Sequence, residues 1–109
     1  MNNPFEKFMQ QAKHIQEAFK KVEEDLKTLR VVGEAGAGAV KVTLDGRRRV
    51  YSIEVEDEIY KEDKPVLLEL IMAAFNDGLN KINETTKTKM AQFTSQFGLP
   101  ANFSFPFDF

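Results

Sequence analysis

The stretch from residue 31 to residue 55 constrains the fold most, because it has the two-residue period of β-strands between two long segments of helical period. Apolar and polar side chains alternate there in two runs, which is typical of strands that bury one face. The apolar positions of these runs are Val40, Val42, Leu44, Tyr51, Ile53 and Val55. We expect these residues to face the core or a dimer interface, with Lys41, Thr43 and Glu54 on the opposite face.

Glycine-containing turns divide this stretch into three strands. Asp45-Gly46 is a preferred central pair for a two-residue hairpin turn, since both positions of that turn need positive φ. Upstream, Gly36-Ala37-Gly38 permits a tight reversal after a first strand at Val31-Val32. The pattern predicts a three-stranded antiparallel meander. These glycines do not form a nucleotide-binding loop, because no helix follows them and no Gly-Lys-Ser/Thr sequence ends them.

The segment before the strands predicts a long amphipathic helix. Asn3 is suited to the N-cap and Pro4 to the first turn. Apolar residues then fill the a and d positions of a heptad pattern, namely Phe5, Phe8, Ala12, Ile15, Phe19, Val22, Leu26 and Leu29. So narrow a stripe needs a partner helix. We expect it to pack on the second helix and across a homodimer.

A second long helix is predicted to start at Pro65 and to stop at Gly98. Its wide apolar stripe is suited to pack against the sheet, and Gly78 within it indicates close packing or a kink. The segment 99–109 alternates phenylalanine with other residues, and its prolines exclude helix. We expect this segment to dock in a groove of its own dimer or to stay disordered until a partner binds. The chain is thus predicted to be one α+β domain (residues 1–109, order α-β-β-β-α, tails 1–3 and 99–109) with projecting helical arms.

Three motifs along the chain resemble one known family. They are Gly33-Glu34-Ala35-Gly36-Ala37-Gly38 with the strand Val40-Lys41-Val42-Thr43 and Gly46, then Ala73-Ala74-Phe75-Asn76-Asp77, and finally Lys89-Met90 with the tail Leu99-Pro100. In this order the chain from Met9 to Phe107 resembles the YbaB/EbfC family of nucleoid-associated proteins. The resemblance implies a cytoplasmic homodimer with tweezer-like helical arms. Such a dimer binds double-stranded DNA in the bacterial nucleoid and can alter DNA conformation and gene expression.

Residue types that most catalytic and metal sites need are scarce. The chain has no cysteine, and its one histidine, His14, occupies a helix position away from the heptad seam. Neither a zinc site nor a catalytic triad can be assembled from these residues. The acidic stretch 54–63 lacks the spacing of a calcium loop. We therefore predict no enzyme, cofactor, metal site or small-molecule substrate, and no membrane association, since no apolar run approaches the length of a span.

A net charge of −2 conceals an uneven distribution of charge. Residues 54–63 are strongly acidic, whereas the free ends of both helices are basic. The lysines expected to bind DNA phosphates are Lys13, Lys20, Lys21, Lys81, Lys87 and Lys89. Polar residues of the same region could add phosphate contacts, namely Thr85, Thr86, Thr88, Gln92 and Gln96. The turn Arg47-Arg48-Arg49 is expected to contribute less, because acidic residues follow it within ten positions.

A second interpretation is a dimeric coiled-coil adaptor that binds protein through its helical arms and its phenylalanine-rich tail. Heptads and a phenylalanine-rich tail fit that function as well. The two interpretations differ in their dependence on salt, because phosphate contacts weaken steeply with ionic strength and an apolar grip does not.

Overall fold

The computed structural model describes residues 3–99 and has the predicted order of elements. These are α1 (Pro4–Thr28), β1 (Arg30–Ala35), β2 (Val40–Asp45), β3 (Val50–Val55), the short 3₁₀ helix η1 (Asp57–Lys61) and α2 (Lys64–Gln96). The strands form one antiparallel sheet in the order β1-β2-β3. The α-β-β-β-α prediction is therefore confirmed. The expectations for the tail after residue 99 lie outside the described residues.

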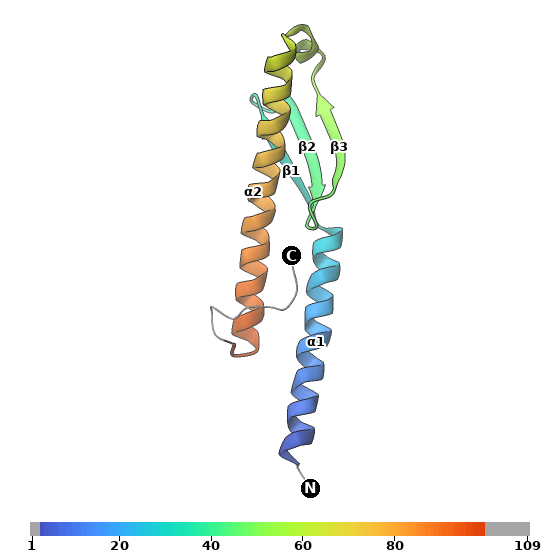
Figure 1. Cartoon of the computed structure of the whole chain (residues 1–109), viewed down its shortest axis with the longest axis vertical. Helices are drawn as coiled ribbons and strands as arrows, with labels where there is room; N and C mark the ends of the chain where they lie inside the picture. The colour runs from blue at the N-terminus through green and yellow to red at the C-terminus, as the bar shows by residue number, and fades with distance from the viewer. Residues whose placement is uncertain (1–2, 100–109) are drawn as a thin grey trace.

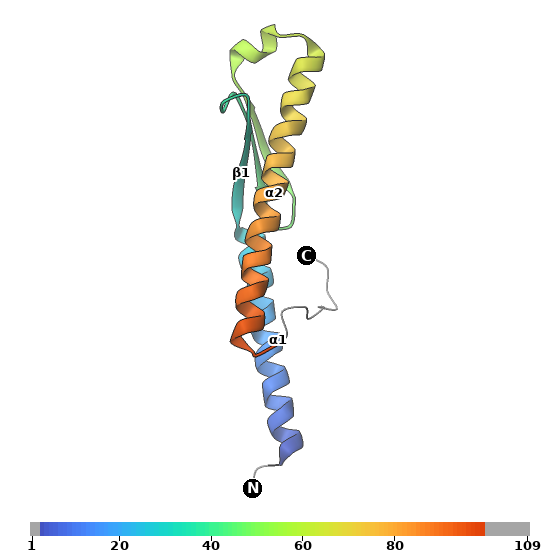
Figure 2. The ribbon, with the colours of Figure 1, turned by 90° about the vertical axis from the view of Figure 1, so that its left-hand side faces the viewer.

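The molecule is an elongated rod of 74 × 22 × 19 Å. Its first long helix leads into the sheet, and α2 then runs back across one face of the sheet and on past its end (Figure 1). Beyond the sheet α2 lies beside the C-terminal half of α1, with the two helices antiparallel. The view at 90° places the sheet and α1 in one layer and α2 in the other (Figure 2).

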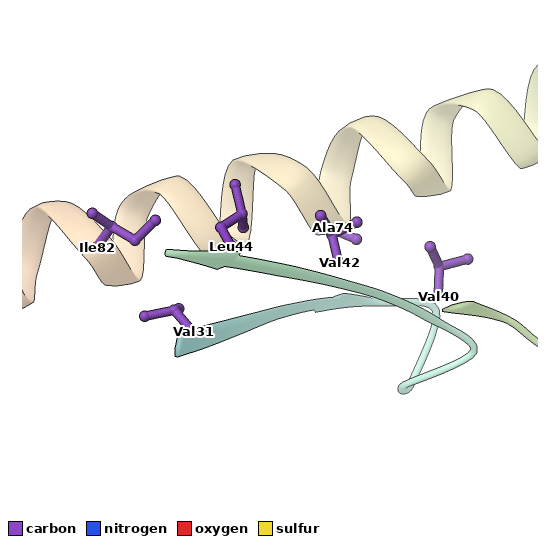
Figure 3. Packing of buried hydrophobic residues seen from close by; sticks show 6 residues of the cluster. All are labelled: Val31, Val40, Val42, Leu44, Ala74 and Ile82. Atoms are coloured by element: carbon purple, nitrogen blue, oxygen red, sulfur yellow. The ribbon is translucent and has the colours of Figure 1, made fainter. Parts of the chain in front are cut away.

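The hydrophobic core lies between α2 and the strands β1 and β2. Side chains of β2 rise toward α2, as Figure 3 shows for Val40, Val42 and Leu44, all of which are 0% exposed. Ala74 and Ile82 meet them from the helix, and both are also 0% exposed. Burial of each valine, leucine or isoleucine side chain of this core stabilises the fold by about 1.5–3 kcal/mol. The alternating residues of β2 thus form the centre of the core.

A pair of glycines sets the distance between β1 and α2. A Cβ atom on Gly33 would overlap the carbonyl oxygen of Ala74 and the backbone of Gly78. A Cβ atom on Gly78 would in turn overlap a methyl group of Leu44. Gly78 therefore serves close packing of helix on strand, which decides between the two roles that its sequence position suggested.

The outer edge of β1 is bound by side chains of α2. The backbone N–H of Glu34 donates to Asp77 Oδ2 at 2.9 Å, and Lys81 Nζ donates to the carbonyl of Val32 at 2.9 Å. Lys81 and Asp77 also form an ion pair at 3.0 Å. The Glu34 N–H, and then Lys81, lower the pKa of the Asp77 carboxyl. Edge strands present backbone groups that can recruit other strands, and here α2 satisfies two of those groups.

The hairpin between β2 and β3 differs from the predicted two-residue turn. Its loop spans residues 46–49, and the residue with positive φ is Arg48 (φ 69°) rather than Gly46. The Asp45 carboxylate organises the loop, since its Oδ1 accepts the N–H groups of Arg47 (2.8 Å) and Arg49 (2.9 Å). Gly46 has another role, because its N–H donates to Leu26 O at 2.8 Å. The backbone of Gly46 lies so close to that of Leu26 in α1 that a side chain on residue 46 would not fit.

The expectation that Tyr51 faces the core is wrong. A β-bulge shifts the register between β2 and β3, so that Leu44 pairs with Val50 and Tyr51 is left without a partner in the ladder. The Tyr51 hydroxyl donates to Asp45 Oδ2 at 3.1 Å, and its ring lies 3.9 Å from the Arg30 guanidinium. Tyr51 therefore belongs to a polar cluster at the hairpin, and it is 52% exposed.

The other predicted core residues of β3 lie on the expected face but are only partly covered. Ile53 pairs with Val42 and Val55 pairs with Val40, which places both on the side of α2. Ile53 is nevertheless 51% exposed, and Val55 is half-buried. An α-helix is about 10 Å wide and strands are about 4.8 Å apart, so one helix covers about two strands. Here α2 covers β1 and β2.

Candidate nucleic-acid interface

Among residues 3–99, the end of the molecule away from η1 consists of the two helices alone (Figure 1). Asn3 caps α1 as predicted, since its side-chain oxygen accepts the N–H of Phe5 at 3.0 Å. The helices meet through aromatic rings, with the centroids of Phe19 and Phe93 5.9 Å apart in an edge-on arrangement. We call this helical part of the molecule the arm.

The predicted lysines of α1 lie on the outside of the arm. Phe19 is 5% exposed and marks the side of α1 that faces α2. Lys20 and Lys21 follow it by one and two residues, which rotates them about 100° and 200° away from that contact. Lys13 lies two turns before Lys20, and all three side chains are exposed. The ammonium groups of α1 are therefore accessible to a ligand outside the arm.

Two of the predicted lysines of α2 lie on the same arm. Lys89 precedes Phe93 by one helical turn, so it lies close to the level of Lys20 and Lys21 along the rod. Lys87 is exposed and Lys89 is half-buried. The structure thus gathers five of the six predicted lysines on the helical end of the molecule.

Lys81 is the exception. Its ammonium group is engaged with Asp77 and with the carbonyl of Val32, beside the sheet rather than on the arm. It stabilises the contact of α2 with β1, a role that the sequence pattern did not indicate. The signal that could have indicated it is the spacing of Asp77 and Lys81, which is that of an i,i+4 ion pair.

The polar residues of α2 differ in their availability. The hydroxyls of Thr85 and Thr88 donate to carbonyls one turn earlier, at 3.0 Å each. The hydroxyl of Thr86 is buried, and within residues 3–99 it has no hydrogen-bond partner. An open hollow on the surface of α2 is lined by Lys87, Thr88, Ala91, Gln92, Ser95 and Gln96. Of these, Ser95 was not foreseen as a polar contact.

The arginine turn lies where the sheet meets the arm, and not among the acidic residues. The six residues of β3 separate the turn from η1. At 3.3 Å per residue, the turn and the acidic residues of η1 are therefore about 20 Å apart. The reason for discounting these arginines is therefore wrong. Arg48 Nη2 donates to Asn83 Oδ1 at 2.7 Å, whereas Arg47 and Arg49 are exposed.

Two other features are absent from the described part of the chain. No helix within it has the length and apolar character to span a bilayer. No group of three or more His, Cys, Asp or Glu side chains there is arranged to hold a metal ion.

Comparison with known proteins identifies the family. The family model described as the YbaB/EbfC DNA-binding family matches residues 1–97. The chain belongs to this family. A YbaB/EbfC assignment agrees with a relative from Methylococcus capsulatus, the nucleoid-associated protein MCA1327, which is 38% identical over 107 residues, covering 98% of this chain and 100% of that protein. The resemblance carried by the three motifs is thereby confirmed.

The fold of this chain is also found in a solved structure. The crystal structure of the uncharacterized protein HP0035 from Helicobacter pylori matches with a TM-score of 0.72 at 22% identity, over 84% of this chain and 97% of that one. At this identity the match supports the fold alone. The family match ends at residue 97, so the phenylalanine-rich segment that follows lies beyond it.

Proposed function

We propose that this protein binds double-stranded DNA in the nucleoid as a homodimer, and that the lysines of the arm contact the phosphates. Membership of a family described as DNA-binding supports the activity, and the relative named as nucleoid-associated supports the location. The observation that carries the proposal is the gathering of Lys13, Lys20, Lys21, Lys87 and Lys89 on the helical end.

The charge distribution along the rod favours this placement. The acidic residues of η1 and its flanks lie at the opposite end of the molecule, beyond the sheet (Figure 1). A duplex can therefore approach the arm without approaching those carboxylates. Lysine binds phosphates as a point charge and reads no base sequence, so the expected binding is weakly sequence-selective and strongly dependent on salt.

A second copy of the chain is proposed to cover β3. The outer edge of β1 is bound by α2, whereas β3 forms the other edge of the sheet and has Val50 and Ile53 44% and 51% exposed. Two open features, a strand edge and an apolar surface beside it, suit a two-fold contact between copies. A dimer would double the number of lysines that one duplex meets.

Charge reversal on the arm tests the DNA site. We expect Lys20→Glu/Lys21→Glu and Lys87→Glu/Lys89→Glu to weaken binding to a duplex, titrated at about 50 and about 200 mM salt. The slope of log affinity against log salt should become shallower by about 1 for each phosphate that the variant no longer neutralises. A matched control is Lys61→Glu/Lys64→Glu, which makes the same change of charge at the η1 end and should leave binding unchanged.

The arginine turn supplies a third variant for this experiment. Arg47→Glu/Arg49→Glu changes exposed residues and leaves the Arg48–Asn83 hydrogen bond in place. We expect a smaller loss of affinity than in either lysine variant, because the turn lies where the sheet meets the arm and not on the arm itself (Figure 1). Loss of binding in the arginine variant with normal binding in both lysine variants would move the site to the turn. Absence of salt-dependent binding in the parent protein would refute the DNA-binding function itself.

The adaptor function is the second candidate. It is favoured by exposed apolar residues at the start of α1, where Phe5 and Phe8 are 66% and 64% exposed. An adaptor would bind a protein partner with little dependence on salt, and the lysine variants would leave that binding intact.

A further inference from the structure

The apolar seam of α1 continues past the end of α2. Phe19 is 5% exposed where α2 covers it, whereas Phe5, Phe8 and Met9 are 66%, 64% and 52% exposed. Ala12 is exposed as well. Figure 1 shows why: the first turns of α1 extend beyond the last turn of α2. We call Phe5, Phe8, Met9 and Ala12 the bare seam.

The chain leaves α2 beside the point at which the bare seam begins. Phe93 packs on Phe19, and the ring of Phe97 lies 5.1 Å from that of Phe93. Gly98 then adopts a left-handed φ of 66°, and the N–H groups of Gly98 and Leu99 donate to Ser95 O (3.3 Å) and Thr94 O (2.8 Å). This pair of hydrogen bonds is a Schellman motif, which ends the helix at a defined place. Leu99, the last described residue, is half-buried.

The sequence that follows is suited to cover an apolar surface. Residues 100–109 contain phenylalanine at four alternate positions (Phe103, Phe105, Phe107 and Phe109), and their one charged residue is Asp108. In an extended segment, alternate side chains point to one face. Pro100 and Pro106 disfavour helix and are compatible with an extended backbone.

The length of this segment is sufficient. Ten extended residues span up to about 33 Å. The seam that must be covered runs from the level of Phe97, near Ile15, to Phe5, which is about 15 Å along a helix at 1.5 Å per residue. The segment can therefore reach the first turn of α1 from its own attachment point.

We propose that residues 100–109 dock in cis on the bare seam, with their alternate phenylalanines packed against Phe5, Phe8 and Met9. Attachment at the adjacent end of α2 gives the segment an effective concentration on the order of millimolar at the bare seam of its own chain. Lys20 and Lys21 lie two turns or more beyond Ala12, so this docking leaves them exposed, whereas Lys13 follows Met9 by one turn and borders the bare seam. The proposal goes beyond DNA binding and does not depend on it.

The absence of cysteine allows a direct test in the full-length protein. A nitroxide spin label is attached at Ser104→Cys in an isotope-labelled chain, so that one chain carries both labels. This chain is diluted into an excess of chain that carries neither label, and its amide signals are recorded by NMR. We expect strong broadening of signals from residues 5–12 and none from η1 or the first turns of α2. Broadening centred on another surface, or no localised broadening, would overturn the proposal.

Two further samples separate the alternatives. Isotope-labelled parent chain mixed with spin-labelled chain reports only contacts between copies, and we expect no broadening at residues 5–12 there. Broadening in this sample alone would place the segment on a second copy and overturn docking in cis. Phe8→Ser in the spin-labelled chain should abolish the broadening while the unfolding transition is retained, because Phe8 is already 64% exposed. Persistent broadening with Phe8→Ser would exclude the bare seam as the docking surface.

Discussion

Asp45 is a carboxylate that the fold buries and yet keeps charged. It is 1% exposed, and burial by itself would raise the pKa of its carboxyl. The N–H groups of Arg49 and Arg47, the Tyr51 hydroxyl and the charge of Arg30 together outweigh burial, so that the pKa of Asp45 is lowered. One side chain thus joins the hairpin loop, the bulged strand β3 and the first residue of β1.

A lowered pKa in the folded state makes stability depend on acid in a known direction. The contribution of Asp45 is complete above the pKa of an unfolded aspartate, about 3.9, and is lost as pH falls through its lower folded pKa. We expect Asp45→Asn, which keeps an oxygen acceptor for the loop, to show a shallower fall in the free energy of unfolding below about pH 4. Urea unfolding of both proteins, from about pH 2.5 to about pH 6, measures this. An identical pH dependence in the two proteins would mean that Asp45 does not contribute in this way.

At the scale of the elements, the contact of β1 with α2 is close because neither partner has a side chain at the crossing. The two glycines differ in what surrounds them: Gly33 faces backbone atoms of α2, whereas Gly78 faces the end of the Leu44 side chain. A side chain can rotate away, but backbone atoms of a helix cannot move without separating the helix from the strand.

We therefore expect Gly33→Ala to be far more destabilising than Gly78→Ala. Overpacking costs about 1–3 kcal/mol, and Gly33→Ala should reach or exceed the upper value. Gly78→Ala should cost less, because alanine in a helix interior is favoured over glycine by about 1 kcal/mol. The midpoint of urea unfolding for the two variants measures the difference. A larger loss of stability for Gly78→Ala would mean that the contact of Gly78 with Leu44, and not the contact of Gly33 with the backbone of α2, limits how closely α2 approaches the sheet.

At the scale of the whole molecule, the exposed face of β3 makes it possible to disturb association of two copies without disturbing the folding of one. Val42 and Ile53 are neighbours across the sheet on the same face, but Val42 is 0% exposed and Ile53 is 51% exposed in one chain. A charge at Val42 would be buried without a partner, which costs several kcal/mol, about as much as a small domain has in total. A charge at Ile53 would be buried only when a second copy covers it.

We expect Val42→Asp to unfold the protein and Ile53→Asp to give a folded monomer. Circular dichroism reports the fold, and sedimentation velocity at micromolar concentration reports the oligomeric state. Ser52→Asp is a matched control, since Ser52 is exposed on the opposite face of β3 and should leave a dimer intact. A parent protein that sediments as a monomer, or an Ile53→Asp variant that remains dimeric, would refute association through this face.

Patterns within single segments predicted much of this protein. The two-residue period predicted β2 and its buried face, the heptads predicted α1, and the glycine motif with its companions predicted the family. Caps and stops were predicted as well, at Asn3 and at Gly98. These features follow from sequence because backbone geometry converts spacing into a face, and a glycine or cap residue acts on the few residues around it.

What depends on the placement of one segment against another was decided only by the tertiary structure. One helix is too narrow to cover β3 as well. Ile53 is therefore exposed, although the alternation of apolar and polar residues along β3 predicts it to be a core residue. A bulge turns Tyr51 to the polar cluster, and the approach of α2 to β1 engages Lys81. The length of β3 separates the arginine turn from the acidic residues that follow it in sequence. Period and composition specify which face of a segment is apolar, but they do not specify which neighbour covers it, because that depends on distances between segments that are remote along the chain.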